Sequence, residues 1–420
     1  MILCLRLFLI SYEVLFFYNP PTILTKGCTM AHKKIMASFT LFGLMISANA
    51  ADISISTYGR LGAIGSFDFS GSKSSYAGTL AHLGADFSLT NGFKWGLGAI
   101  GAWAAWQDSR YGTNSTLPYE GGGDASEAYV GFKNRLISFY AGRFKNDFMK
   151  FDWLQGNVQG FSLRFSTYED KASYWITYTN SYLYNGKQHN YIQGDRIAGD
   201  LTTLSPFNPN SKNSLVGGEI IALGMDFSIK HFLLKPFAFI NTDAQKRGAL
   251  FQAGLKAGFN FNISNDFLST TVLQAMYQYW DIVPNGSASS VLVWGDETLR
   301  YKNFLFGAGV LGIIGNENSR IYALSDSSKF YGRTMFSQYY APYFKGGSLS
   351  GYVFGGFSMN NRIRVDGMVS FGSYAEYSIV STFGIWKQDN MKLDVGVGYA
   401  YVDAKLLTGN ALNAFVKFSY

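Results

Sequence analysis

The sequence predicts an all-β protein, and specifically a transmembrane antiparallel β-barrel. Apolar and polar residues alternate along most of the chain after residue 50. Only 15% of the residues are charged, against about 25% in average soluble domains, whereas 17% are aromatic. Beyond the N-terminal region, no uninterrupted apolar run reaches the ~20 residues that a helical span requires. Strands with one lipid-facing and one lumen-facing side produce this pattern, and closure into a barrel pairs every backbone group inside the bilayer.

A signal peptide is predicted over residues 30–50. Lys33 and Lys34 form its basic start, and the apolar run 35–46 follows them. The small residues after this run fit a cleavage site that follows Ala50. The run is too short to span a bilayer as a stable helix, so we expect export and then removal of the peptide.

Residues 1–29 precede the methionine that would start the signal peptide. They are largely apolar, and we interpret them as an upstream extension from a misassigned start codon, with a membrane anchor as the alternative. The barrel would then occupy residues 51–420 as a single domain. Both cysteines, Cys4 and Cys28, lie before it, so the mature chain offers neither a disulfide nor a thiolate metal site.

Eighteen strands can be placed from the alternation and from the turn residues between them. A count of sixteen is the alternative, because residues 282–300 and 372–380 are weakly patterned. Tight turns such as Asn91-Gly92 alternate with long connections at 108–124, 183–215 and 316–346, as is typical of outer-membrane barrels. The predicted strands are 53–67, 79–90, 93–107, 125–133, 136–145, 158–168, 171–182, 216–229, 231–243, 250–263, 267–281, 291–300, 303–315, 347–358, 362–373, 375–386, 392–403 and 411–420.

The prolines give a check that did not enter the placement of the strands. Five of the six after residue 50 fall in predicted long connections. Pro236 falls near the start of its predicted strand, where a missing hydrogen-bond donor is best tolerated.

The alternation also predicts which charged residues face the lumen. A charge at the bilayer midplane on the lipid side costs about 2–4 kcal/mol, so charges are expected on the inner wall. Eighteen strands enclose a lumen wide enough for water, and lumenal charges then set selectivity. The inward-facing candidates are Arg60, Glu127, Lys133, Arg164, Lys256, Arg362 and Arg364.

The last strand, 411–420, ends on two outward aromatic residues, Phe418 and Tyr420. An aromatic chain end of this kind resembles the closing strand and assembly signal of bacterial outer-membrane barrels. The resemblance implies recognition by the barrel-assembly machinery, and lipid and lipopolysaccharide as the surroundings of the folded barrel. The sequence does not decide between a monomer and a homotrimer, although the lipid face shows no polar stripe that would mark a subunit contact.

The segment 124–165 carries a more specific resemblance. It contains A-G-R, then N-D-F, then Q-G-F-S-L, and it resembles the region around the inward-folded third loop of the OprD family of porins. The mature length, the signal peptide and the terminal tyrosine are similar to the Hof outer-membrane family of Helicobacter, which is OprD-like. The resemblance implies an eighteen-stranded outer-membrane barrel with a loop-narrowed, partly basic channel for small carboxylate-bearing or amino-acid-like solutes.

Carried over to this sequence, the resemblance places Arg143 and Arg164 beside the constriction. The loop 146–157 would narrow it, with Asp147 and Asp152 as its acidic members. The planar guanidinium of arginine binds a carboxylate at two points and stays charged, which suits it to guide such solutes. The chain shows no unbroken row of arginines, and its loop is rich in aromatic residues.

Other functions fit the sequence less well. An enzyme is not expected, because the mature chain has three histidines that cannot converge on one rim and no G-x-S-x-G elbow. The net charge of +7 comes without a basic run, so nucleic acid is not expected as a partner. No metal or other cofactor is predicted. A surface adhesin or antigen acting through the loops 183–215 and 316–346 is the alternative function, since exposed loops often carry binding.

Overall fold

The computed structural model of the chain describes a β-barrel unit within residues 53–420. Across this part, no helix is long and apolar enough to cross a membrane. The residues described are 53–69, 75–107, 122–146, 157–167, 171–185, 204–205, 217–282, 286–322, 344–360, 362–404 and 407–420.

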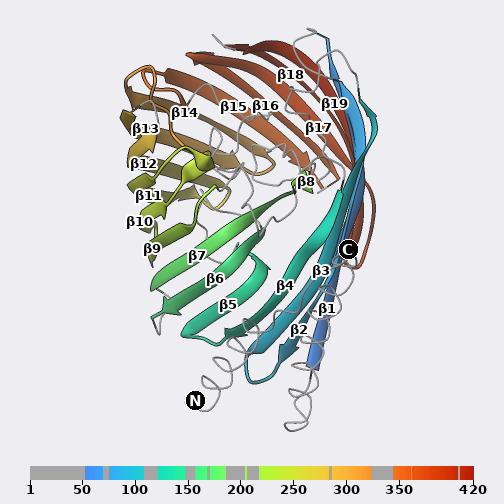
Figure 1. Cartoon of the computed structure of the whole chain (residues 1–420). Helices are drawn as coiled ribbons and strands as arrows, with labels where there is room; N and C mark the ends of the chain where they lie inside the picture. The colour runs from blue at the N-terminus through green and yellow to red at the C-terminus, as the bar shows by residue number, and fades with distance from the viewer. Residues whose placement is uncertain are drawn as a thin grey trace, which may run out of the picture. The chain divides into compact units, whose positions relative to one another are not determined.

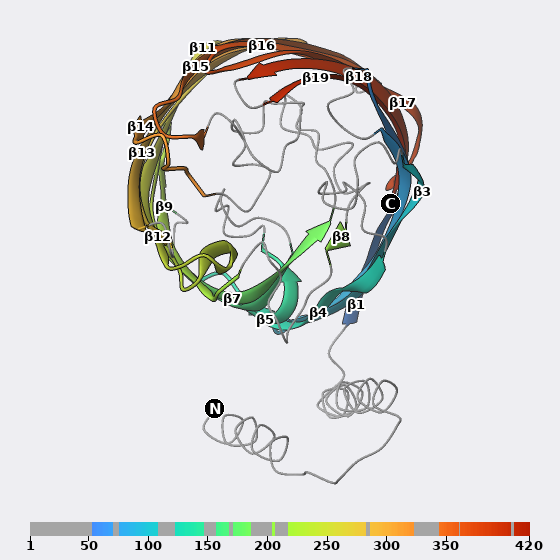
Figure 2. The same cartoon turned by 45° about the horizontal axis from the view of Figure 1, so that its top comes forward.

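Eighteen strands form the wall of the barrel, and Figure 2 shows them as a closed ring. The short strand β8 (Leu204–Ser205) is additional and pairs only with the end of β7. The wall strands are β1 (Ile53–Asp68), β2 (Tyr76–Leu89), β3 (Phe93–Gln107), β4 (Gly122–Lys133), β5 (Ile137–Lys145), β6 (Asn157–Ser166), β7 (Ala172–Asn185), β9 (Ile220–Ile229), β10 (Phe232–Asn241), β11 (Leu250–Ser264), β12 (Phe267–Ile282), β13 (Gly286–Tyr301), β14 (Phe304–Gly315), β15 (Leu349–Met359), β16 (Ile363–Gly372), β17 (Tyr374–Gln388), β18 (Met391–Ala404) and β19 (Leu407–Ser419).

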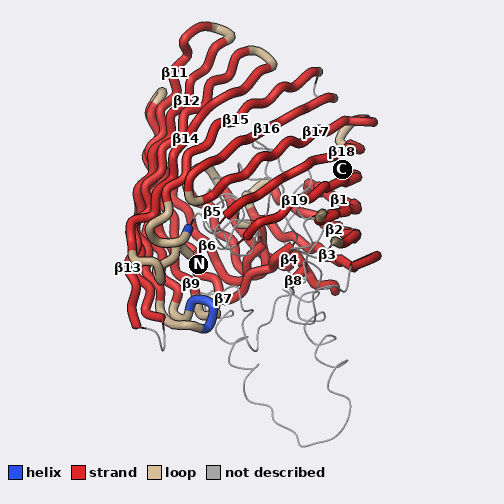
Figure 3. Tube along the Cα trace, turned by 90° about the horizontal axis from the view of Figure 1, so that it is seen from above, coloured by secondary structure: helices blue, strands red, loops and turns tan. Residues whose placement is uncertain are grey.

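Each wall strand pairs antiparallel with the wall strand that precedes it, and β19 pairs with β1 to close the ring (Figures 1 and 3). The predicted count of eighteen is therefore confirmed. The two weakly patterned segments, 282–300 and 372–380, form most of β13 and the first part of β17. They are ordinary members of the wall, so the alternative of sixteen strands is wrong.

The connections differ between the two ends of the strands. One end, which we call the short-turn rim, carries turns such as 230–231, 265–266, 302–303 and 389–390. Lys302 and Asp389 both adopt φ of 49° in these turns. The other end, the long-loop rim, carries the longer connections, and a single-turn 3₁₀ helix (Ala244–Lys246) links β10 to β11 there. The strand bounds confirm the predicted short turns of one rim, and at the long-loop rim they leave three connections that are also short, at 283–285, 373 and 405–406.

Pro236 interrupts the pairing between β9 and β10. The register of these two strands runs from Leu234 opposite Phe227 directly to Phe237 opposite Gly224. The other edge of β10 pairs without a break, with Pro236 opposite Leu255. Proline lacks the N–H that the β9 ladder needs, and two residue pairs, those of Lys235 and Pro236, are missing from the register on that side.

The alternating faces separate an apolar outer wall from a polar inner wall. Large outward side chains are exposed, for example Ile55 at 61%, Leu273 at 50% and Val310 at 49%. Inward polar side chains such as Gln252 and Asp366 are buried, with exposed fractions of 0% and 1%. Because directly opposite residues of an antiparallel pair share a face, the ladder carries this division around the ring.

The seam between β1 and β19 is closed by the last residue of the chain. Gly59 and Tyr420 exchange two backbone hydrogen bonds, each of 3.1 Å. The ring of Tyr420 covers Gly59, where an added β-carbon would lie 2.4 Å from a ring atom. Phe418 lies beside Tyr420 and stacks on Trp386. Closure of the barrel therefore depends on a glycine facing the terminal aromatic residue.

The end of β7 leaves the ring of strands and projects into the lumen, where it meets β8 (Figure 2). The neighbouring ends of β5 and β6 carry residues with almost no exposed surface, namely Phe144 at 1% and Val158 at 0%. The long-loop ends of β5–β7 thus form the part of the wall that narrows the interior.

Candidate functional site

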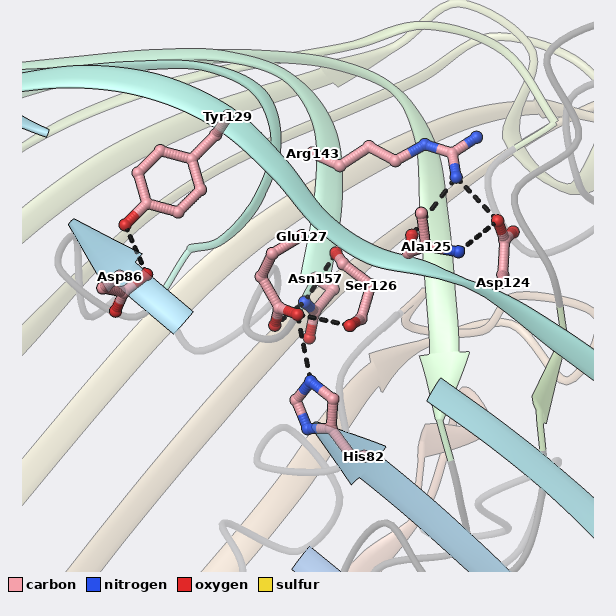
Figure 4. Close-up of polar contacts among 9 residues, drawn as sticks. All are labelled: His82, Asp86, Asp124, Ala125, Ser126, Glu127, Tyr129, Arg143 and Asn157. Atoms are coloured by element: carbon pink, nitrogen blue, oxygen red, sulfur yellow. Dashed lines mark hydrogen bonds and ion pairs between the residues drawn. The ribbon is translucent and has the colours of Figure 1, made fainter. Parts of the chain in front are cut away.

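A cluster of buried polar side chains lies on the inner wall where β2, β4 and β6 approach one another (Figure 4). Nε2 of His82 lies 3.0 Å from Oε2 of Glu127, and each residue is only 4% exposed. Glu127 stands opposite Gly98 of β3, whose missing β-carbon would otherwise collide with its carboxylate. The glycine thus lets the carboxylate of β4 cross β3 and reach the imidazole of β2.

Asn157, the first residue of β6, completes this cluster. Its Nδ2 donates to Oε1 of Glu127 at 2.8 Å and to the backbone oxygen of Ser126 at 3.0 Å. Ser126 also donates its hydroxyl to Glu127. A serine nucleophile needs its hydroxyl bound to a base such as histidine, and here the hydroxyl binds the carboxylate instead. The Ser126–Glu127–His82 arrangement is therefore structural in geometry rather than that of a catalytic triad.

Both ends of the connection 147–156 are held on this inner wall. Asn146 is fully buried and accepts a hydrogen bond from Ser162 of β6 at 3.1 Å. Asn157 is held by Glu127 as described above. Asp147 and Asp152, the predicted acidic members of the constriction loop, lie outside the described residues.

Three tyrosines extend the polar surface along the same part of the wall. Tyr129 donates its hydroxyl to Asp86 at 2.7 Å, and its ring lies 5.5 Å from that of Tyr140. The ring of Tyr58 meets the imidazole of His82 edge-on, with 5.6 Å between the centroids. This sector of the wall thus combines uncharged phenol groups with the carboxylates of Asp86 and Glu127.

A second polar system lies on the inner wall of β10–β12. The segment 316–322, which begins the connection between β14 and β15, is bound there. Nε2 of Gln252 donates to the backbone oxygen of Tyr322 at 2.8 Å, and Oε1 of Gln278 accepts from the backbone N–H of Tyr322 at 2.8 Å. Gln278 also donates to the backbone oxygen of Arg320 at 2.5 Å.

This binding changes the interpretation of the predicted loop 316–346. Ile321 and Tyr322 are buried, with only 2% and 3% of their surface exposed, and Phe344 from the returning end is 2% exposed. The backbone N–H of Ile321 donates to the oxygen of Phe344 at 2.9 Å. The two described ends of this connection therefore lie against the inner wall and narrow the lumen from the side of β10–β12.

Basic residues meet a carboxylate on neighbouring strands of the inner wall. Arg164 lies 3.3 Å from Asp226, and Lys235 lies 4.0 Å from the same carboxylate. Lys256 stands opposite Lys235 in the ladder and places its ammonium 5.6 Å from the ring centroid of Trp294. The β6–β11 sector is thus the part of the wall where cationic side chains gather.

The wall from β13 to β18 carries paired charges of both signs. Asp296 accepts from the hydroxyl of Tyr352 at 2.6 Å, and this hydroxyl accepts from the indole N–H of Trp294 at 2.7 Å. Arg364 is 3.0 Å from Asp366. Lys392 and Asp394 form a similar pair at 3.0 Å.

The remaining predicted basic residues differ in position. Arg60 stands opposite His82 and therefore on the inner wall beside the cluster. Lys133 ends β4, and Arg362 lies in the turn before β16, so both are exposed at the short-turn rim. The structure does not bring these two residues to the narrow part of the lumen.

Arg143 and Arg164 were expected to flank one loop, and the register does not bring them together. Arg143 stands opposite Gln159 near the long-loop end of β5, whereas Arg164 stands opposite Ser138 near the short-turn end. Five ladder positions separate them, or about 17 Å at ~3.3 Å per residue. The place of both arginines beside a single constriction, and the role of each in selectivity, stay predictions.

The contacts of Arg143 are local. Its guanidinium binds Asp124 at 2.6 Å, as Figure 4 shows, and it also donates to Gln159 at 2.9 Å. In the ladder, Arg143 shares a face with Ala141 and stands opposite Ala128, which places it on the outward-facing side of the sheet. It can therefore border the channel only where the long-loop ends of these strands turn inward.

Sequence reasoning missed His82, Asn157, Gln252 and Gln278. His82, Gln252 and Gln278 occupy inward positions of strands that were predicted at nearly the right bounds, so the alternation alone marked them as lumenal. Asn157 stands opposite Lys145 at the start of β6 and had been placed in the loop 146–157. Their partners come from distant positions, such as Glu127 for His82, 45 residues apart. Among the described residues, no group of His, Cys, Asp and Glu side chains could hold a metal ion.

Comparison with known proteins reveals a fold likeness without a sequence likeness. No protein-family model and no curated protein sequence matches the chain. The outer membrane protein OpdK of Pseudomonas aeruginosa superposes with a TM-score of 0.66 at 11% identity, over 87% of this chain and 99% of that one. OccAB2 of Acinetobacter baumannii gives a TM-score of 0.64 at 12% identity, over 87% and 98%.

A BenF-like porin from Pseudomonas fluorescens gives a TM-score of 0.65 at 11% identity, over 88% of this chain and 98% of that one. These alignments span nearly the whole of each solved structure. At such low identity they speak for the arrangement of the strands alone. The chain therefore shares the barrel fold of these porin structures.

Proposed function

We propose that this protein is an outer-membrane porin that lets small hydrophilic solutes diffuse through its lumen. The observation that carries the proposal is a closed ring of eighteen strands with an apolar outer wall and a hydrogen-bonded, charged inner wall. Closed barrels of this kind satisfy the backbone in lipid, and a polar interior in a wide barrel suits a water-filled path.

The orientation and surroundings of the barrel follow from the same proposal. Short turns face the periplasm and long loops face outward in barrels of this class. The short-turn rim, with both ends of the barrel chain, would then be periplasmic. This proposal includes the predicted signal peptide and recognition of Phe418 and Tyr420 by the assembly machinery. It also includes contact with lipopolysaccharide and kinship with the Hof and OprD-like proteins.

We further propose that the solutes bear a carboxylate or resemble amino acids. The basic sector of Arg164, Lys235 and Lys256 supports an anionic contact, because lumenal charges of one sign attract the opposite sign of solute. The carboxylates of Asp86 and Glu127 lie on strands β2 and β4, away from that sector. A dipolar solute would thus find both signs of charge on the wall.

Single-channel recording of the purified, heat-modifiable protein in planar bilayers tests the proposal. Stable conductance steps are expected, with a reversal potential in a salt gradient that reports the dominant lumenal charge. A properly folded barrel without conductance would contradict the porin function and favour the adhesin alternative.

Arg143→Ala and Arg164→Ala address the finer part of the proposal. Each is expected to alter ion selectivity without loss of the folded barrel, and Arg164→Ala is expected to act more strongly because it leaves Asp226 with Lys235 alone. Unchanged reversal potentials and solute uptake in both variants would remove these arginines from the site.

A further inference from the structure

One carboxylate lies on the lipid-facing side of the barrel wall. Glu297 of β13 stands opposite Thr271 of β12 and Ala308 of β14. It alternates with Asp296, which faces the lumen, and shares its face with Val293, which is 49% exposed. This single carboxylate is not a polar stripe of the kind that would mark a subunit contact, but it is a polar group on the outer wall.

Glu297 is the one charged side chain set within the outward apolar band of the described strands. The other charged residues with outward register lie close to the long-loop rim, where headgroups and water begin. Those residues are Arg143, Lys145, Asp281 and Asp403. A charge inside the band is costly, so its retention calls for a compensating partner.

Two hydroxyls of the wall supply part of that compensation. Ser269 donates to Oε1 of Glu297 at 2.5 Å, and Thr271 donates to Oε2. A carboxylate offers about four acceptor positions, so about two stay available on the side that faces the membrane. The outward residues next to Glu297 include Gly295 and Ala308. Their small side chains leave space above the carboxylate on the outer surface.

Glu297 lies just on the acyl side of the membrane interface at the short-turn rim, one outward position from it. It lies four residues before the end of β13 at Tyr301, or about 10 Å along the barrel axis for a strand tilted by ~40°. An aromatic belt begins one outward position below, where Phe306 is 44% exposed and the rings of Phe267 and Tyr301 pack edge-on. Such belts mark the interface between headgroups and acyl chains.

A second copy of the chain does not offer the matching charge. No described strand carries an outward cation at this depth, since Arg143 and Lys145 lie at the opposite rim. The missing partner is thus a cation that the membrane itself provides. A primary ammonium group has three N–H donors, which fit the free positions of a carboxylate that two hydroxyls hold in place.

We propose that Glu297, Ser269 and Thr271 form a binding site for the ammonium headgroup of a phosphatidylethanolamine molecule on the outer wall. The site depends on the barrel lying in a membrane and is independent of conduction through the lumen. Single-channel recording tests conduction and lipid retention tests this site. A porin without the lipid site and a lipid-binding barrel that does not conduct would therefore be told apart.

Native mass spectrometry of the folded full-length barrel tests this proposal. The protein is equilibrated with phosphatidylethanolamine and phosphatidylcholine of identical acyl chains, because the quaternary ammonium of the second lipid has no N–H donor. Wild type is expected to retain phosphatidylethanolamine preferentially. Glu297→Gln is expected to lower that preference about tenfold, the scale of one hydrogen bond to a charged group.

Asp281→Asn serves as the matched control, since it removes an outward carboxylate at the other rim and should keep the preference. Thr271→Val gives a second variant that retains the charge and loosens its support, with a smaller loss expected. Equal retention of the two lipids by wild type would overturn the proposal, as would a preference that survives Glu297→Gln. Loss of a stable oligomer in Glu297→Gln, with lipid retention unchanged, would assign the residue to a subunit contact instead.

Discussion

Asn157→Asp is the change that most directly tests how the narrow part of the lumen is held. The substitution keeps the size of the side chain and replaces the amide donor by an acceptor. Both hydrogen bonds from Nδ2 disappear, namely those to Glu127 at 2.8 Å and to the backbone oxygen of Ser126 at 3.0 Å. A carboxylate oxygen then faces the carboxylate of Glu127 at nearly the same distance.

The free-energy cost is dominated by charge repulsion. Two like charges about 3 Å apart repel by about 5 kcal/mol at an effective dielectric constant of about 20. Loss of a hydrogen bond to a charged group adds about 1.5–3 kcal/mol. The cost falls on the first residue of β6, which is paired with β5 and β7 along the rest of its length. We therefore expect local detachment of this strand end and an intact barrel.

Two measurements report that detachment. Single-channel recordings of Asn157→Asp are expected to show more open-channel noise and additional conductance levels. Limited trypsin digestion is expected to cleave faster after Lys150, which lies in the adjoining connection. Asn262→Asp is the control, because Asn262 is an exposed inward residue of β11 and gains the same charge without losing these contacts. Wild-type traces and digestion rates in Asn157→Asp would refute the anchoring role of the cluster.

Two further predictions concern the seam and the second narrowing segment. Gly59→Ala should lower the folded, heat-modifiable fraction, because its β-carbon would lie 2.4 Å from the terminal tyrosine ring and such overpacking costs about 1–3 kcal/mol. Gly355→Ala, whose nearest neighbour would be 3.7 Å away, should fold normally, and equal yields of the two variants would contradict the packing argument. Gln278→Leu removes the bonds to the segment 316–322 and should raise single-channel conductance. Gln274→Leu, on the same face of β12, should leave it unchanged, and a similar rise in both would show that wall volume rather than anchoring sets the current.

The strands of this protein could be predicted from sequence because their signal is local. Alternation with a period of two residues repeats within each strand, and turn residues separate one strand from the next. This was enough for all eighteen wall strands and for the inward position of Arg364 and Lys256. The lumenal assignment of Arg143 rested on a family resemblance, and its own alternation with Phe139 and Ala141 favoured the other face.

The contacts of the site could not be predicted in the same way, because they depend on register and on irregularities of the ladder. A register shift between β3 and β4 leaves Ser126 without an opposite residue in the ladder and places Glu127 opposite Gly98. Only this register brings the carboxylate to His82. The attachment of residues 316–322 to Gln252 and Gln278 depends on a connection folding back inside the barrel, which a local pattern does not encode.

The glycines beneath the inward tyrosines have a consequence for the water column in the barrel. Tyr58 covers Gly84, Tyr129 covers Gly96 and Tyr352 covers Gly309, and in each case a β-carbon would collide with the ring. Each ring therefore lies flat along its neighbour strand instead of pointing at the barrel axis, and the cross-section open to water is kept. The phenol hydroxyls of Tyr58 and Tyr129 are left at fixed places as uncharged contacts, whereas Tyr352 is buried and bound to Asp296 and Trp294. Salt screens charges and leaves such contacts intact, so part of the discrimination between solutes should persist at high ionic strength.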